Sequence, residues 1–188
     1  KKFDDSVLND PQDMDISISG VIHVADTLSR RIIQIDLNGK IVNQVDMEKT
    51  SNNERILVKT IHVRDDGHVF TADFDECIVY EFNSKLEIIR ELDFSVYKEK
   101  IHVIRAVFAL GENLILCTRG IDQVLVVDYG GNIIRGINCK DETGYDWNHP
   151  VKICGNRRGG IFIIDKENDR VISLAKDLSI KSCFGFGI

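Results

Sequence analysis

The feature that most constrains this chain is a repeat with a period of 45 to 47 residues. An apolar segment that closes on a polar residue, Ile22-His23-Val24-Ala25-Asp26, returns in segments that end at Asp73, Thr118 and Asp165. The three intervals are 47, 45 and 47 residues long. A fixed period of tens of residues is typical of repeat architectures, in which each copy is one supersecondary unit.

Each copy is predicted to hold four short strands, because β-rich runs alternate with turn residues. We expect them at 14–18, 21–25, 32–35 and 40–45; at 58–63, 68–72, 78–82 and 86–92; at 103–108, 113–117, 124–127 and 132–137; and at 151–154, 161–164, 171–174 and 179–184. The copies then span about 11–45, 58–92, 103–137 and 150–184.

The second strand of every copy is almost continuously apolar, which is expected when both of its faces are covered. The turns agree with tight hairpins, since Asp36-Leu37-Asn38-Gly39, Asp65-Asp66-Gly67, Tyr129-Gly130-Gly131-Asn132 and Arg158-Gly159-Gly160 supply residues that tolerate positive φ. Four-stranded units at this period describe blades of a β-propeller. The sequence therefore predicts an all-β chain with four antiparallel blades, and 1–188 as one propeller region without a linker.

Composition narrows the function classes. No apolar run approaches the roughly 18 residues that cross a bilayer, so we expect no membrane partner. A net charge of −6 argues against DNA and disfavours RNA, because phosphate binding rests on clustered Lys and Arg. The five cysteines form no C-x-x-C pair and fall mostly in or beside predicted strands, which predicts small buried thiols and favours a cytoplasmic location.

Two of the four copies carry a more specific pattern, an acidic strand end followed by Arg and an apolar run. Asp26 is followed by Arg31, Asp165 is followed by Arg170, and the proline that opens each of these copies lies 15 residues before its Asp. This pattern resembles the NHL repeat. The second copy has no Arg after Asp73, and the third carries Thr and Gln at the two positions, so only half of the copies keep the signature.

The resemblance implies a six-bladed propeller of the kind found at the C-terminus of tripartite-motif ubiquitin ligases, where it recognises a substrate protein or RNA. No RING, B-box or coiled coil occurs in these residues. Four blades would then be part of a larger ring, because an open arc leaves strand edges and blade faces uncovered. A compact, cooperative monomer in solution would contradict this expectation.

A protein partner is the function we expect, with the propeller as the substrate-recognition module of a tripartite-motif-like ligase or scaffold. The loops between second and third strands share a face with the long blade connections, and we expect the contact residues there. They are Arg30, Arg31, Asp75, Glu76, Arg119, Tyr145 and Trp147. The Asp-Arg pairs are better explained as structural pairs that fix the turn between the second and third strands. For Trp147, packing between blades is as good an explanation as contact with a partner.

Two other functions stay open. An RNA-binding NHL domain is disfavoured because the expected loop face is acidic overall. A metal-dependent propeller hydrolase or lyase is suggested by His102 and His149, which are 47 residues apart at equivalent positions near the channel mouth. No repeated set of oxygen ligands accompanies them, so we expect no metal or other cofactor. No catalytic motif is present, so we expect no enzyme activity in this chain.

Overall fold

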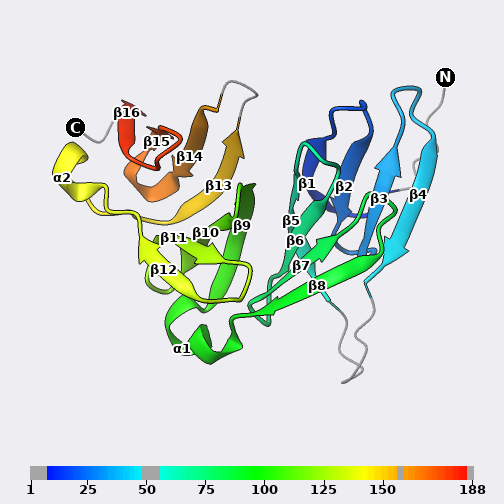
Figure 1. Ribbon diagram of the computed structural model, residues 1–188, viewed down its shortest axis with the longest axis horizontal. Helices are drawn as coiled ribbons and strands as arrows, with labels where there is room; N and C mark the ends of the chain where they lie inside the picture. Colours follow the sequence, from blue (N-terminus) through cyan, green and yellow to red (C-terminus); the bar gives the residue numbers. More distant parts are fainter. Residues whose placement is uncertain (1–7, 48–55, 156–158, 186–188) are drawn as a thin grey trace. The chain divides into compact units, whose positions relative to one another are not determined.

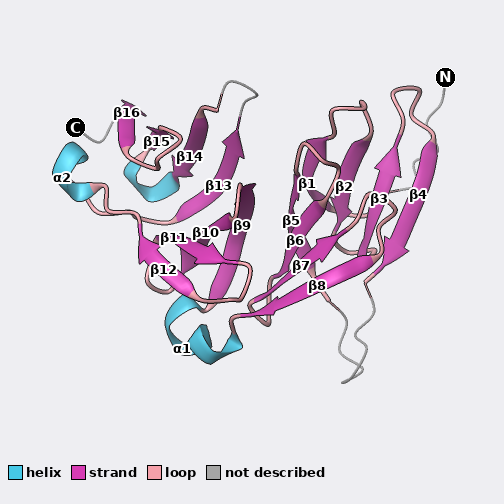
Figure 2. Ribbon diagram, viewed as in Figure 1, coloured by secondary structure: helices cyan, strands magenta, loops and turns pink. Residues whose placement is uncertain are grey.

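The computed structural model describes residues 8–47, 56–155 and 159–185. It confirms the all-β class and the four antiparallel blades, each a sheet of four strands in sequence order (Figures 1 and 2). The chain divides into two compact units, Lys1–Glu91 and Leu92–Ile188, with two blades in each. Each unit is described separately. The six-bladed ring stays a prediction.

Unit 1 contains blades 1 and 2. Blade 1 consists of β1 (Pro11–Ile16), β2 (Ile22–Asp26), β3 (Arg31–Ile35) and β4 (Ile41–Asp46). Blade 2 consists of β5 (Val58–Val63), β6 (Val69–Asp73), β7 (Ile78–Phe82) and β8 (Ile88–Asp93), whose last residues enter unit 2.

Unit 2 contains blades 3 and 4. Blade 3 consists of β9 (Val103–Leu110), β10 (Asn113–Arg119), β11 (Val124–Asp128) and β12 (Ile133–Gly136). Blade 4 consists of β13 (Pro150–Gly155), β14 (Ile161–Asp165), β15 (Arg170–Leu174) and β16 (Ile180–Gly185). The sequence did not predict four short helices. The blade connections hold η1 (Ser95–Tyr97), α1 (Lys98–Ile101) and α2 (Lys140–Thr143), and the loop between β14 and β15 holds η2 (Lys166–Asn168).

Several predicted strand boundaries differ from the structure by two or three residues, and at two of them a turn starts earlier or ends later than the apolar pattern suggests. The first strand ends at Ile16 and not Ile18, since Ser17 N donates to Val21 O at 2.9 Å and closes a turn there. The eighth begins at Ile88 and not Leu86, because Leu86 has a φ of 62° and closes the preceding turn onto Asn83 O.

The two blades of each unit pack face to face on an apolar core. In unit 1 the cluster joins residues such as Ala25 and Ile32 of blade 1 to Tyr80 and Phe82 of blade 2. In unit 2 the cluster joins the equivalent sheets of blades 3 and 4. Burial of these side chains supplies most of the folding free energy, at about 25 cal/mol per Å² of apolar area.

One polar contact recurs in both units and fixes the blade-to-blade register. Asn43 Nδ2 of blade 1 donates to Lys85 O of blade 2 at 2.9 Å. Arg135 Nη2 of blade 3 donates to Asp177 O of blade 4 at 3.3 Å. Both residues of the second contact lie 92 positions after those of the first. The two units therefore repeat one blade interface.

The second strands are buried on both faces in most blades, as predicted. All five residues of β6 are buried, whereas in β14 Ile164 is 42% exposed. The expectation of buried thiols was also wrong in blade 4, where Cys154 is exposed. Both exceptions lie on the face of blade 4 that turns away from blade 3. Among the described residues, no helix is long and apolar enough to span a membrane.

Candidate partner-binding site

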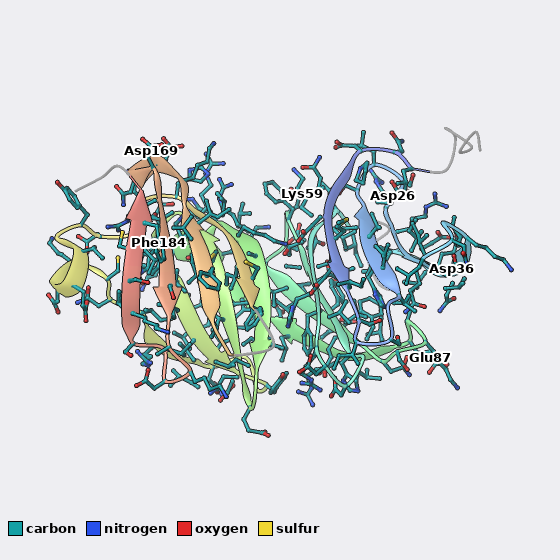
Figure 3. All side chains as sticks on the ribbon, turned by 90° about the horizontal axis from the view of Figure 1, so that it is seen from above. Asp26, Asp36, Lys59, Glu87, Asp169 and Phe184 are labelled. Carbon is teal, nitrogen blue, oxygen red and sulfur yellow. The ribbon has the colours of Figure 1, made fainter. Side chains whose placement is uncertain are left out.

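The turn between β2 and β3 is held by a carboxylate that bridges three segments. Asp26, at the end of β2 (Figure 3), is fully buried and accepts from Arg31 Nε at 2.8 Å through Oδ2. Its Oδ1 accepts from Asn9 N at 2.6 Å, which ties the chain that enters β1 to the same turn. The predicted structural role of this pair is confirmed.

Asp165 repeats the arrangement in blade 4. Its Oδ1 accepts from Asn148 N at 2.8 Å and its Oδ2 accepts from Arg170 Nε at 2.6 Å. Both side chains are almost fully buried, at 0% and 1% exposure. A buried carboxylate needs such partners, because water is not available to solvate it. In blade 3, Thr118 takes the position and donates its hydroxyl to Gln123 O at 3.0 Å.

Arg170 also organises the connection that carries α2. Its Nη1 donates to Thr143 Oγ1 at 2.8 Å, and its Nη2 donates to the carbonyls of Tyr145 and Asp146, each at 3.1 Å. The loop is thereby held by a buried guanidinium, because this planar group can donate N–H hydrogen bonds to several acceptors at once. Tyr145 stays 49% exposed on this ordered loop.

Trp147, predicted as a contact residue, belongs to the core of unit 2. It is 7% exposed, packs in the cluster formed by blades 3 and 4, and donates its indole N–H to Ile137 O at 2.6 Å. A buried donor that is already satisfied gives a partner little to contact. The packing alternative therefore describes Trp147, and we remove it from the contact surface.

The predicted contact residues of unit 1 are Arg30, Arg31, Asp75 and Glu76. Arg31 is engaged with Asp26, and Arg30 is half-buried with a φ of 55°, its carbonyl accepting from Met47 N at 2.8 Å. Asp75 is exposed, and its backbone N donates to Asp73 Oδ1 at 3.0 Å. Glu76 is half-buried. These residues are largely part of the turn scaffold.

Unit 2 contains a group of basic side chains that sequence reasoning found only in part. We call it the cationic cluster, and its members are Arg105, Arg119, His149, Lys152 and Lys166. Arg105 is on β9 and Arg119 ends β10, its neighbour in the sheet, while Lys152 is on β13, which packs against both strands. Of these five, the sequence predicted Arg119 and His149.

A repeat signal was present for Lys152 alone. Asp13 and Lys152 occupy one position of their blades, because they pair with the equivalent residues Ala25 and Ile164. In unit 1 the Asp13 carboxylate accepts from Ile61 N of β5 at 2.9 Å. In blade 3 this position is Ala106, paired with Cys117, and Arg105 is the bulge residue before it. Comparing charge by repeat position would therefore not have found Arg105.

Burial and neighbouring positive charges both act on members of the cluster, while Lys166 forms an ion pair with Glu167 at 3.7 Å. Burial and then the charge of Arg119 lower the pKa of Arg105, although Asp122 opposes this. Burial and then the charges of Arg105 and Lys166 lower the pKa of His149. Within the described ranges, the side chains of Arg105 and Arg119 form no hydrogen bond or ion pair. Such cations are ready to bind an anion.

His102 lies at the edge of this cluster. It is exposed, and its Nε2 is 2.9 Å from Glu99 O. Its backbone forms an isolated parallel β-bridge with that of Arg119. Gly120 is required beside it, because a Cβ there would lie 2.3 Å from Lys100 O. In the part of the chain that the structure describes, no three His, Cys, Asp or Glu side chains gather as metal ligands.

Comparisons with known proteins support the fold alone. No protein-family model matches the chain, and no curated protein matches it. A Bacteroides caccae protein of unknown function aligns over 93% of this chain and 60% of its own, with 13% identity and a TM-score of 0.69. A streptogramin B lyase aligns over 94% and 54%, with 10% identity and a TM-score of 0.68.

A third solved structure is a catalytically inactive virginiamycin B lyase from Staphylococcus aureus with quinupristin. It aligns over 94% of this chain and 55% of its own, with 14% identity and a TM-score of 0.67. The chain thus spans little more than half the length of these proteins. At such low identity the likeness shows a shared fold and carries no activity to this chain.

Proposed function

We propose that this chain is a protein-recognition module that binds an acidic segment of a partner protein at the cationic cluster. The observation that supports it most is the pair Arg105 and Arg119, adjacent arginines whose side chains form no hydrogen bond or ion pair among the described residues, with Asp122 as the nearby acid. Arginine forks match carboxylates in bidentate geometry. Tyr145, exposed on the loop that Arg170 orders, supplies an aromatic contact in the same unit.

A short acidic peptide suits the cluster better than RNA does. The acids Asp122 and Glu167 lie close to the cluster, and the chain as a whole carries a charge of −6. A long polyanion meets this net repulsion, whereas a few carboxylates meet mainly the local cations. In a tripartite-motif-like ligase or scaffold, such a module selects the substrate, and ligase chemistry requires a RING domain.

The test measures binding of a fluorescent peptide of about ten glutamates by anisotropy. We expect the double variant Arg105→Gln/Arg119→Gln to bind about tenfold more weakly, since two charge-assisted contacts are lost. Lys181→Gln is the matched control, because Lys181 is exposed on β16 and outside the cluster. Its affinity should equal that of the parent chain.

A glutamine peptide of the same length and a structured RNA pool complete the design. Equal binding of the glutamine peptide, or equal loss in the Lys181→Gln control, contradicts the proposal. The RNA pool is tested by gel shift at about 50 and about 200 mM salt, because phosphate contacts weaken steeply over that range. Tight, salt-sensitive RNA binding without peptide binding would replace the protein partner by RNA.

A further inference from the structure

The interface between blades 1 and 2 contains a row of polar side chains that crosses all four strands of blade 1. Paired in register from β1 to β4, its members are Asp15, His23, Gln34 and Asn43. Three of them contact blade 2 directly. Asp15 Oδ2 accepts from Val63 N at 2.8 Å, Gln34 Nε2 donates to Ser84 O at 3.1 Å, and Asn43 Nδ2 donates to Lys85 O at 2.9 Å. We call this the polar row.

Unit 2 builds the same interface with a different row. At the equivalent positions of blade 3, paired in the same register, are Phe108, Ile115, Val126 and Arg135. The three apolar members belong to the core that joins blade 3 to blade 4. Folding of this interface therefore does not require His23 and Gln34, and a buried polar pair is costly unless its hydrogen bonds are satisfied.

The hydrogen bonds of His23 fix its protonation state. The side chain is 2% exposed, its Nδ1 is 3.2 Å from Val21 O, and its Nε2 is 2.8 Å from Gln34 Nε2. A carbonyl can only accept, so Nδ1 carries a proton and donates to Val21 O. The Gln34 amide is oriented independently, because its NH₂ group donates to Ser84 O. The same NH₂ group faces His23, so Nε2 of the ring is the acceptor and carries no proton.

A second proton on the ring is incompatible with this arrangement. Protonation of His23 Nε2 places an N–H donor against the Gln34 NH₂ donor, and these nitrogens are 2.8 Å apart. The Gln34 amide must then rotate to present its Oε1 to the ring, and Ser84 O loses the N–H that bound it. The hydrogen bond that is lost joins blade 1 to blade 2.

We propose that His23 is an acid-sensitive latch: when its ring takes up a proton, Gln34 is released from Ser84 and blade 2 loosens from blade 1. Unit 2 has Ile115 and Val126 at the two positions and should keep its blade interface over the same pH range. The latch lies in unit 1 and does not involve the cationic cluster. The proposal therefore does not depend on acidic-peptide binding.

The surroundings of His23 set the direction of the response. The charge that acts on the ring is that of Asp15, its partner across β1 and β2, and His62 Nδ1 of β5 is 3.0 Å from the same carboxylate. The groups that face the ring from β3, and beyond it from the turn before β8, are uncharged. Burial lowers the pKa of His23 and outweighs the Val21 carbonyl and Asp15, which raise it.

The sign of the pH dependence follows from this direction. The ring takes up a proton less readily in the closed unit than in the loosened one, where its pKa is about 6.5. The stability that this site contributes is therefore complete above about pH 6.5 and falls as the pH is lowered below that value.

Hydrogen exchange of the full chain, followed by NMR and corrected for the intrinsic rate, tests the latch at about pH 7.5 and about pH 5.5. The reporters are the amides of Ile61 and Val63, which donate from blade 2 to Asp13 and Asp15 of blade 1. We expect their opening to be about three- to tenfold more populated at the lower pH, since one pH unit below 6.5 allows at most about a tenfold effect. Amides of β10 and β11 in unit 2 should keep their protection.

Two variants separate the latch from other titrating groups. His23→Ile/Gln34→Val reproduces the apolar pair of blade 3 and should abolish the acid response of the reporters. Asn43→Ala is the matched control, because it removes a blade contact without removing a titratable ring. It should increase opening by the same factor at both pH values and retain the acid response. A parent chain without an acid response overturns the proposal, as does an equal response in His23→Ile/Gln34→Val.

The ¹⁵N chemical shifts of the His23 ring provide a measurement that needs no variant. At about pH 7.5 we expect the proton on Nδ1 and none on Nε2, with titration only below about pH 6.5. The side-chain amide signals of Gln34 should shift together with the ring. A proton on Nε2 at neutral pH, or titration of the ring while the Gln34 signals stay unchanged, contradicts the latch.

Discussion

Single residues decide how the loops of unit 2 are held, and Arg170 is the clearest case. It contacts a buried carboxylate and four acceptors of the α2 connection. The sequence pattern predicted its pairing with Asp165, because both residues recur at one repeat position. The additional loop contacts could not be predicted, since no local pattern links Arg170 to residues 24 to 27 positions earlier.

We expect Arg170→Ala to lower the free energy of unfolding by about 3–5 kcal/mol, because it leaves Asp165 buried without its cation. Arg170→Lys should recover part of this loss, since the charge returns without the fork geometry. Arg31→Ala should cost less, because Arg31 is 18% exposed and water can reach the vacated site. Urea denaturation measures all three, and equal losses for Arg31→Ala and Arg170→Ala would refute the burial argument.

At the scale of elements, the hairpin turns follow directly from the sequence. The predicted turn residues Gly39, Gly67, Gly131 and Gly159 all have φ between 82° and 88°. A side-chain carboxylate or amide at the turn start, such as Asp36 or Asp128, accepts from the backbone N–H groups that follow it. These contacts lower the pKa of both carboxyls, with the Lys40 N–H leading for Asp36 and the Asn132 side chain for Asp128.

Gly131→Ala tests the turn, because its φ is 82° while the nearest atom to an added Cβ, Asp93 O, is 3.9 Å away. The cost is thus conformational and should be about 1–2 kcal/mol. Gly131→Asn should cost less than half as much, because Asn adopts this conformation more readily. Thermal unfolding of both variants checks the order, and an Asn variant no better than Ala would contradict the backbone explanation.

Over the whole molecule, the five cysteine side chains differ in how far they are buried. Cys77, Cys117 and Cys139 are buried, Cys183 is half-buried and Cys154 is exposed. Burial raises the pKa of Cys117, and burial raises that of Cys139 to about 11 against the opposing charge of Arg170. Reactive thiolate is therefore scarce at Cys117 and Cys139.

In dilute solution, a chromogenic disulfide reagent should react quickly with Cys154 and more slowly with Cys183. The three buried thiols should react only after denaturation, because burial blocks their access and also raises the pKa of Cys117 and Cys139. Cys154→Ser should remove the fast phase alone. A fast phase that survives this substitution would show that one of the buried cysteines is accessible.

The sequence alone determined the number of blades, their strand order and the chemistry of their turns. These depend on local period and local residue type, which are fixed by chain spacing and by φ preferences. Tertiary structure decided which predicted contact residues are available. Trp147 is buried and Ile164 exposed because their burial depends on the neighbouring blade, and Arg105 joins Arg119 through packing that sequence distance does not reveal.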